Sequence, residues 1–180
     1  HAENLLEYVT GLKVTEVFAD LSIFVEGRQL DDDGNVLIHM ENGVKGVLYA
    51  SQISVGEENG PQLRVYGEKG SIAWDQLNPN KLIVKWLDQP AQHITPGGNY
   101  SYLSELAMAN TRLPAGHPEG YLEAFANLYK HFATQIRCRL DGKDCPAVSL
   151  DVPTIADGIR GMKFIRAVVQ SSREQCWLKV

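Results

Sequence analysis

The sequence has few cysteines, no excess of positive charge and no long hydrophobic run. Its three cysteines, Cys138, Cys145 and Cys176, form no C-x-x-C pair, so we expect reduced thiols rather than disulfides or a structural zinc site. A formal net charge of -5 disfavours a nucleic-acid-binding surface, which gathers Lys and Arg on one face. No apolar stretch has the length of a membrane span and no signal-peptide pattern occurs, so we expect a cytoplasmic protein without a membrane partner.

Several motifs that carry chemistry are also missing. No G-x-G-x-x-G loop follows a strand, so the chain has no dinucleotide-binding loop of its own. The glycines of 67–70 lie between two strand patterns, which favours a hairpin turn over a phosphate-binding loop. The aspartates of 31–33 lack the ligand spacing of a calcium loop, and with Glu57 and Glu58 they are expected to be solvated loop charges. No metal site is therefore predicted.

What the sequence does contain is a group of strand patterns followed by helical patterns. Residues 2–10 predict a short helix that ends at Gly11. Apolar residues alternate over 17–25, and Asn42-Gly43 between the apolar runs 36–40 and 47–51 predicts a hairpin. Further strands are predicted at 63–66, 71–74, 81–87 and 91–95, with a last one at 176–180.

Past Gly98 the apolar period changes to that of a helix. A short helix is predicted around 103–107, and a long one carries the apolar stripe Tyr121, Phe125, Leu128, Phe132 and Ile136 before ending at Asp141-Gly142. A second long helix is predicted from about Pro153, with Ile155, Ile159, Met162, Ile165 and Val169 as its buried side. This order predicts a single α+β domain over residues 1–180, with an open, mostly antiparallel β-sheet and helices packed on one face.

The other face of the predicted sheet is not purely polar. It carries Phe18, Phe24, Leu37 and Leu48 among polar residues. A mixed apolar face of this kind usually contacts another subunit. We therefore expect self-association through this face.

The segment Gly116–Tyr121 is the clearest candidate for a ligand site. Pro118 suits the first position of a helix, which would put His117 and Glu119 beside unpaired backbone N–H groups. From the residues alone, His117 either lines a pocket or only caps the helix. The other internal histidines are less informative: His39 and His131 are expected to be ordinary, partly exposed residues, and His93 has no carboxylate nearby in the sequence.

Three segments together carry a resemblance to a known family. His1–Val14, Val65–Ile72 and Pro114–Phe125, in this order, resemble the C-terminal domain of the glucose-fructose oxidoreductase / inositol dehydrogenase / MocA (Gfo/Idh/MocA) family. The resemblance covers essentially the whole chain. It implies a dihydrodipicolinate-reductase-like open sheet that binds substrate and associates with other subunits through its outer face.

The resemblance also implies an enzyme of which this chain is one part. An N-terminal Rossmann domain, absent from this chain, would hold NAD or NADP, and the substrate would be a sugar or polyol. His1 falls at the histidine of the family's Asp-x-x-x-His signature, so by resemblance it is the catalytic general base. The matching aspartate would lie four residues before His1, and the family's catalytic lysine belongs to the missing domain.

By the same resemblance, His117 and Glu119 are substrate-binding residues, while no residue of this chain binds the cofactor or a metal. The chain alone is expected to be inactive. Two alternatives stay open at this point. The parent protein could have lost catalysis and use this domain for sugar binding or assembly, or the chain could act alone with His117 and Glu119 as an acid/base pair.

Overall fold

The computed structural model describes all residues, 1–180, and the chain divides into two compact units. The first unit joins His1–Glu58 to Pro153–Val180, and the second is Asn59–Val152. The first unit is therefore assembled from both ends of the chain. None of the helices combines the length and the apolar character that crossing a membrane requires.

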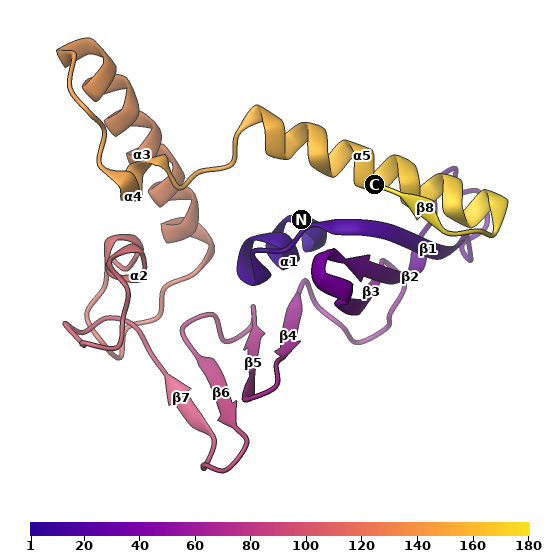
Figure 1. Ribbon diagram of the computed structural model, residues 1–180, viewed down its shortest axis with the longest axis horizontal. Helices are drawn as coiled ribbons and strands as arrows, with labels where there is room; N and C mark the ends of the chain where they lie inside the picture. Colours follow the sequence, from indigo (N-terminus) through magenta and orange to yellow (C-terminus); the bar gives the residue numbers. More distant parts are fainter. The chain divides into compact units, whose positions relative to one another are not determined.

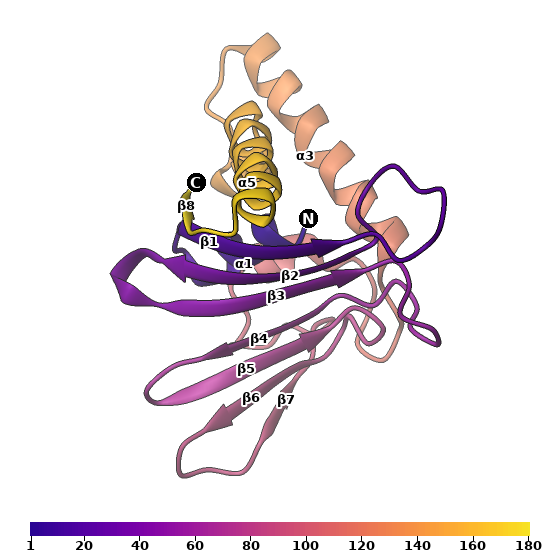
Figure 2. The same ribbon diagram turned by 90° about the vertical axis from the view of Figure 1, so that its right-hand side faces the viewer.

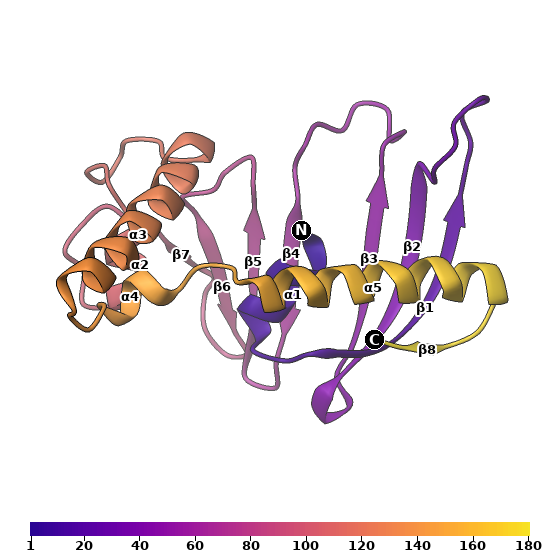
Figure 3. The same cartoon turned by 90° about the horizontal axis from the view of Figure 1, so that it is seen from above.

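The first unit contains one antiparallel sheet, in the order β3-β2-β1-β8, and two α-helices. Its elements are α1 (Ala2–Thr10), β1 (Val14–Ser22), β2 (Asp33–Met40), the 3-10 turn η1 (Glu41–Gly43), β3 (Lys45–Ser51), α5 (Ile155–Glu174) and β8 (Leu178–Lys179). Gly11 ends α1 in the left-handed conformation, as predicted. The predicted hairpin is confirmed too, with Asn42 and Gly43 at positive φ between β2 and β3. Helix α5 packs against β1 and β8 of this sheet (Figures 1 and 3).

The core of the first unit lies between α5 and the inner face of the sheet. Alternate residues of the strands point inward and meet one side of the helix. The core residues are Val14, Val17, Ala19, Val36, Ile38, Met40, Phe164, Ala167 and Val168. Each large side chain buried here contributes roughly 1.5–3 kcal/mol. Four of the five residues predicted for the buried side of this helix are exposed, namely Ile155, Ile159, Met162 and Ile165, and Val169 is half-buried.

The outer face of the same sheet is as mixed as predicted, but one of its expected members is on the other side. Leu48 packs against the core, and Phe24 lies beyond the end of β1 in a loop. Instead Phe18, Leu37 and Val47 pair across β1, β2 and β3 and form one row. Leu37 and Val47 are exposed, so the outer face carries a continuous apolar row.

The aspartate run includes a buried residue, contrary to the prediction of solvated loop charges. The Asp32 carboxylate accepts hydrogen bonds from the N–H groups of Phe24 and Val25 at 2.9 and 3.0 Å. Arg28 pairs with the same carboxylate at 3.3 Å. The Phe24 N–H in particular holds the pKa of Asp32 below its ordinary value. Asp32 therefore organises the loop that joins β1 to β2.

The second unit contains a separate antiparallel sheet, in the order β4-β5-β6-β7 (Figure 2). Its elements are β4 (Gln62–Tyr66), β5 (Gly70–Asp75), β6 (Leu82–Trp86), β7 (Gln92–Ile94), α2 (Glu105–Asn110), α3 (Tyr121–Asp141) and α4 (Ala147–Leu150). The turn at 67–70 is a hairpin, as predicted, closed by a 2.8 Å bond from Gly67 N–H to the Gly70 carbonyl. The α+β class with antiparallel strands is confirmed, with the strands in two sheets rather than one.

Helix α3 has an unexpected distribution of polar and apolar residues. Its predicted apolar stripe is exposed within the chain, with Tyr121 and Phe132 the most open. The buried residues of α3 are Asn127 and His131. A helix that buries polar side chains needs hydrogen-bond partners for them.

Candidate functional site

His1 occupies the position before the first turn of α1. It is the N-cap residue, but its side chain does not cap the helix and is exposed. Its carbonyl accepts the Leu5 N–H at 2.9 Å, so the backbone of His1 is held while the imidazole remains available.

The buried carboxylate of Glu7 ties α1, the helix that follows His1, to the rest of the first unit. The Glu7 carboxylate accepts hydrogen bonds from Val14 N–H at 2.9 Å, from Lys13 Nζ at 2.7 Å and from Arg160 Nη2 at 2.8 Å. Burial raises the pKa of Glu7, but the hydrogen bonds from Arg160, Lys13 and Val14 outweigh it and leave the pKa below its ordinary value. Helix α1 is therefore tied to β1 and α5.

Glu3 is buried in the same cluster but is poorly partnered. Its Oε1 atom makes no hydrogen bond and lies 3.7 Å from Arg160 Nε. Burial, followed by the charge of Glu7, raises the pKa of Glu3, and Arg160 offsets this only in part. Helix α1 thus contains two buried carboxylates of opposite kind. The charged form of Glu7 is stabilised by its hydrogen bonds, whereas the charged form of Glu3 is disfavoured by burial.

The segment that holds His117 and Glu119 lies one turn before α3 rather than in it. The helix begins at Tyr121 with Gly120 as its N-cap, so the placement of Pro118 at the first helical position was wrong. The Glu123 carboxylate accepts the Gly120 N–H at 2.9 Å, and this bond lowers the pKa of Glu123. Glu123, in the first turn of the helix, therefore accepts a backbone N–H at the helix start, where Glu119 was expected to lie.

Glu119 has a different set of contacts. Its Oε1 atom accepts hydrogen bonds from the N–H groups of Arg112 and Leu113, the second at 2.8 Å. Glu119 therefore closes residues 112–119 into a loop. Its carboxylate makes no hydrogen bond with His117, so the geometry does not favour an acid/base pair of these two residues.

His117 is exposed at the far end of this loop. Its Nδ1 atom lies 3.2 Å from the carbonyl oxygen of Pro114, which requires Nδ1 to carry the proton and donate. Nε2 is then free to contact a ligand. The structure brings His117 and Glu119 together in one loop of the second unit, whereas His1 belongs to the first unit.

The remaining histidines differ in their surroundings. His39 stacks on Trp177 with ring centroids 4.0 Å apart and lies 3.4 Å from the Glu16 carboxylate. His93 is exposed on β7, whereas His131 is only 3% exposed, so the expectation of a partly exposed residue was wrong there. The signal that could have revealed it is the spacing of Asn127 and His131, which places both on one side of α3.

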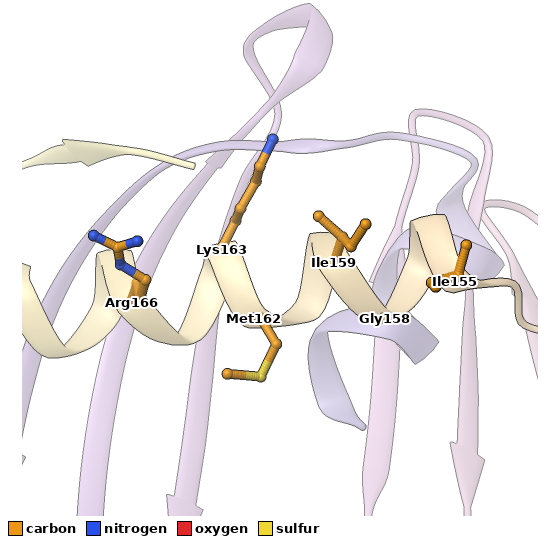
Figure 4. A pocket seen from close by; sticks show the side chains of 6 residues that line it. All are labelled: Ile155, Gly158, Ile159, Met162, Lys163 and Arg166. Atoms are coloured by element: carbon orange, nitrogen blue, oxygen red, sulfur yellow. The ribbon is translucent and has the colours of Figure 1, made fainter.

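Helix α5 presents a shallow hollow of about 500 Å³ on its exposed side. Figure 4 shows the residues that line it along successive turns, namely Ile155, Gly158, Ile159, Met162, Lys163 and Arg166. Gly158 contributes no side chain to the hollow, and no other residue comes within 4 Å of the place that its Cβ would take. The hollow is an open apolar surface with the positively charged side chains of Lys163 and Arg166 at one end. Elsewhere in the chain, no group of three or more His, Cys, Asp or Glu side chains is arranged to hold a metal ion.

Comparison with known proteins assigns the chain to a family. Residues 1–73 match the GFO/IDH/MocA C-terminal domain. An oxidoreductase from Sinorhizobium meliloti is 42% identical in sequence, and its structure agrees over 98% of this chain with a TM-score of 0.90. The chain belongs to the GFO/IDH/MocA family. The predicted resemblance is therefore confirmed.

Two further relatives bear on the activity of proteins that are similar to this chain. An uncharacterized oxidoreductase of Bacillus subtilis (strain 168), YfiI, is 35% identical over 164 residues. An inositol dehydrogenase homolog from Azotobacter vinelandii, in complex with NADH and myo-inositol, is 28% identical and agrees over 99% of this chain with a TM-score of 0.85. This chain spans 41% of the B. subtilis protein, 49% of the S. meliloti chain and 48% of the A. vinelandii chain.

Proposed function

We propose that this chain is the substrate-binding and oligomerisation domain of an NAD(P)-dependent oxidoreductase that acts on a secondary alcohol of a sugar or polyol. The observation that carries the proposal is the backbone agreement with the A. vinelandii protein, whose complex holds both NADH and myo-inositol. The length of that relative supports a second domain in the parent protein. We refer to this proposed dinucleotide-binding domain, upstream of His1, as the companion domain.

The residues of this chain do not fit the dinucleotide themselves. No G-x-G-x-x-G loop joins a strand to a helix, so nothing here forms the backbone cradle that a pyrophosphate needs. When bound to the companion domain, the nicotinamide would accept the hydride. We assign the removal of the hydroxyl proton and the contacts with the substrate to this chain.

In this proposal His1 is the general base. Its imidazole, which makes no cap hydrogen bond with α1, takes the proton of the reacting hydroxyl group as the carbinol carbon is oxidised. His117 contacts the hydroxyl groups of the substrate through its free Nε2 atom, and Glu119 acts in the same site by fixing the loop. An aspartate four residues before His1 and a lysine of the companion domain would complete the catalytic group.

Two exposed apolar surfaces support the assembly that we propose. The stripe on α5, formed by Ile155, Ile159, Met162 and Ile165, is assigned to the companion domain. Glu3 lies 3.7 Å from Arg160, so a domain joined before His1 would begin beside this stretch of α5. The outer sheet face with its row Phe18, Leu37 and Val47 is assigned to a second copy of the protein.

The test is to produce the parent protein with its upstream residues and to follow NAD(P) reduction with a panel of polyols that includes myo-inositol. We expect oxidation of at least one polyol, its loss in His1→Ala, and no oxidation by the 180-residue chain alone. Oxidation of a polyol by the isolated chain would contradict this division of labour. A parent that binds polyols but lacks the upstream aspartate or lysine would instead be a non-catalytic binding module.

A further inference from the structure

A buried polar cluster joins α2, α3 and α4 in the second unit. His131 and Asn127 of α3 and Ser149 of α4 are each less than a tenth exposed. These three elements lie close together in Figure 3. Buried polar groups are costly unless they are hydrogen-bonded, and here each of them has a partner.

The ring of His131 has a defined orientation. Its Nε2 atom lies 2.9 Å from Asn110 Oδ1, while Asn110 Nδ2 donates to the Leu106 carbonyl at 3.1 Å. Because Oδ1 can only accept, Nε2 of His131 carries the proton. In the neutral ring, Nδ1 then accepts from the Ser149 hydroxyl at 3.4 Å. The two nitrogens thus tie the end of α2 to α4.

From Asn110 the hydrogen bonds continue to the loop that holds His117. The Asn110 carbonyl accepts from Asn127 Nδ2 at 2.6 Å, and Asn127 Oδ1 accepts from Arg112 Nε at 2.8 Å. The Arg112 N–H in turn donates to the Glu119 carboxylate. An unbroken series therefore runs from His131 to Glu119.

The loop has few other restraints. No helix or strand occurs between Thr111 and Gly120. Besides the contacts of Glu119, two backbone hydrogen bonds hold the loop. The Ala115 N–H donates to the Gly97 carbonyl at 2.8 Å, and the His117 N–H donates to the Pro114 carbonyl at 3.1 Å. Its geometry consequently depends on side chains that hold its two ends.

We propose that His131 is a positioning residue: acting through Asn110, Asn127 and Arg112, it sets the loop that presents His117 to the substrate. The inference rests on the proposed function for the role of His117 in binding polyol. It assigns a function to a histidine that lies outside the three segments that carry the family resemblance. His131 itself touches no substrate.

Two substitutions separate this role from simple packing. The amide nitrogen of His131→Gln can take the place of Nε2–H and donate to Asn110, whereas His131→Asn is too short and replaces only Nδ1. We expect the Arg112 and Leu113 amide protons of the 180-residue chain to exchange about tenfold faster in His131→Asn and at near-normal rates in His131→Gln. His93→Ala, on exposed β7, is the control and leaves these rates unchanged.

Because His131→Asn removes a buried contact, a surface variant provides a second test. Arg112 is exposed, so we expect Arg112→Leu to keep the fold while it removes the Nε hydrogen bond to Asn127. Its Leu113 amide proton should exchange faster as well. Unchanged exchange in Arg112→Leu, or in a folded His131→Asn, would overturn the proposal.

Kinetic measurements on the parent protein test whether the series of hydrogen bonds from His131 acts through His117. We expect His131→Asn to raise KM for the oxidised polyol about tenfold with little change in kcat, and His131→Gln to restore it. Once His117→Ala has removed the contact, His131→Asn should raise KM no further. Additive effects would overturn the link to His117. A parent that oxidises and binds no polyol would overturn the proposed function, while the exchange rates would still test the positioning of the loop.

Discussion

Arg160 of α5 donates two hydrogen bonds to one carboxylate oxygen of Glu7 in α1, from Nε at 3.1 Å and from Nη2 at 2.8 Å. Nη2 also donates to the carbonyl of Val14 at the start of β1. One guanidinium group therefore joins the first helix, the first strand and the last helix. The geometry of α1, and with it the position of His1, depends on this pair.

Removal of Arg160 should be strongly destabilising. Arg160→Leu leaves the Glu7 carboxylate buried without its main partner, and we expect the free energy of unfolding to fall by about 3 kcal/mol. Lys13→Ala is the matched control, because Lys13 contacts the same carboxylate from an exposed position and should cost less than about 1 kcal/mol. Urea unfolding of the chain measures both. Equal losses in the two variants would contradict the role of Arg160.

Glu3 and Glu7 should respond to pH in opposite directions. The pKa of Glu7 is lowered by folding, so its contribution is present above its ordinary value of 4.5 and is lost as pH falls through the folded value. The pKa of Glu3 is raised, so its contribution is present at low pH and is lost as pH rises through the folded value.

Glutamine substitutions test these signs. At pH 7, Glu3→Gln is expected to stabilise the chain by about 1 kcal/mol, because it removes a poorly partnered buried charge, and the gain should disappear in acid. Glu7→Gln should destabilise the chain at pH 7 and lose its effect in acid. Urea midpoints between pH 3 and pH 8 provide the measurement. A stability loss in Glu3→Gln at pH 7 would show that Arg160 compensates Glu3 fully.

The thiol of Cys145 should react slowly with alkylating reagents. Its burial, and then a hydrogen bond with the Cys138 thiol, raise the pKa of Cys145. Because the thiolate is the nucleophile, Cys138→Ala should accelerate alkylation of Cys145 by iodoacetamide about threefold at pH 8. Mass spectrometry of a time course gives the rate, with Cys176 as the internal reference. An unchanged rate would contradict an influence of Cys138.

The sequence predicts elements whose local signals agree with their packing. Alternation of apolar residues identified the strands that hold Val17 and Ile38, and Asn42-Gly43 identified the hairpin. The buried side of α5 was not predictable in this way, because both sides of the helix are apolar and the core takes Phe164 rather than Met162. Only the three-dimensional contact with the sheet distinguishes them.

In the candidate site, too, some features could be predicted from the sequence and others could not. The place of His1 before a helix followed from the residues after it. The contacts of Glu119 with Arg112 and Leu113 did not, because they depend on a loop that bends back on itself. The burial of His131 depends on α2 and α4, which lie far from it in the sequence. The spacing of Asn127 and His131 places both on one side of α3, but it does not identify the hydrogen-bond partners on α2 and α4.

The outer sheet face offers a test of self-association. Val47 lies in the row with Phe18 and Leu37, whereas Val55 is fully exposed in a loop beyond the sheet. If this face joins two copies, Val47→Lys should abolish the oligomer and Val55→Lys should not, with stability changes within about 0.5 kcal/mol for both. Sedimentation equilibrium measures the mass. A wild-type chain that stays monomeric at high concentration would contradict self-association through this face.

Substitutions on opposite sides of α5 should separate folding from domain association. Phe164 is buried in the core, so Phe164→Ala should cost about 3 kcal/mol in the isolated chain. Met162 is exposed, so Met162→Lys should leave the isolated chain as stable as before but weaken contact with the companion domain. In the parent protein, calorimetry should then show two unfolding transitions in place of one. Met108→Lys, on the exposed surface of α2, is the control. A single unchanged transition in Met162→Lys would mean that the companion domain does not cover this part of α5.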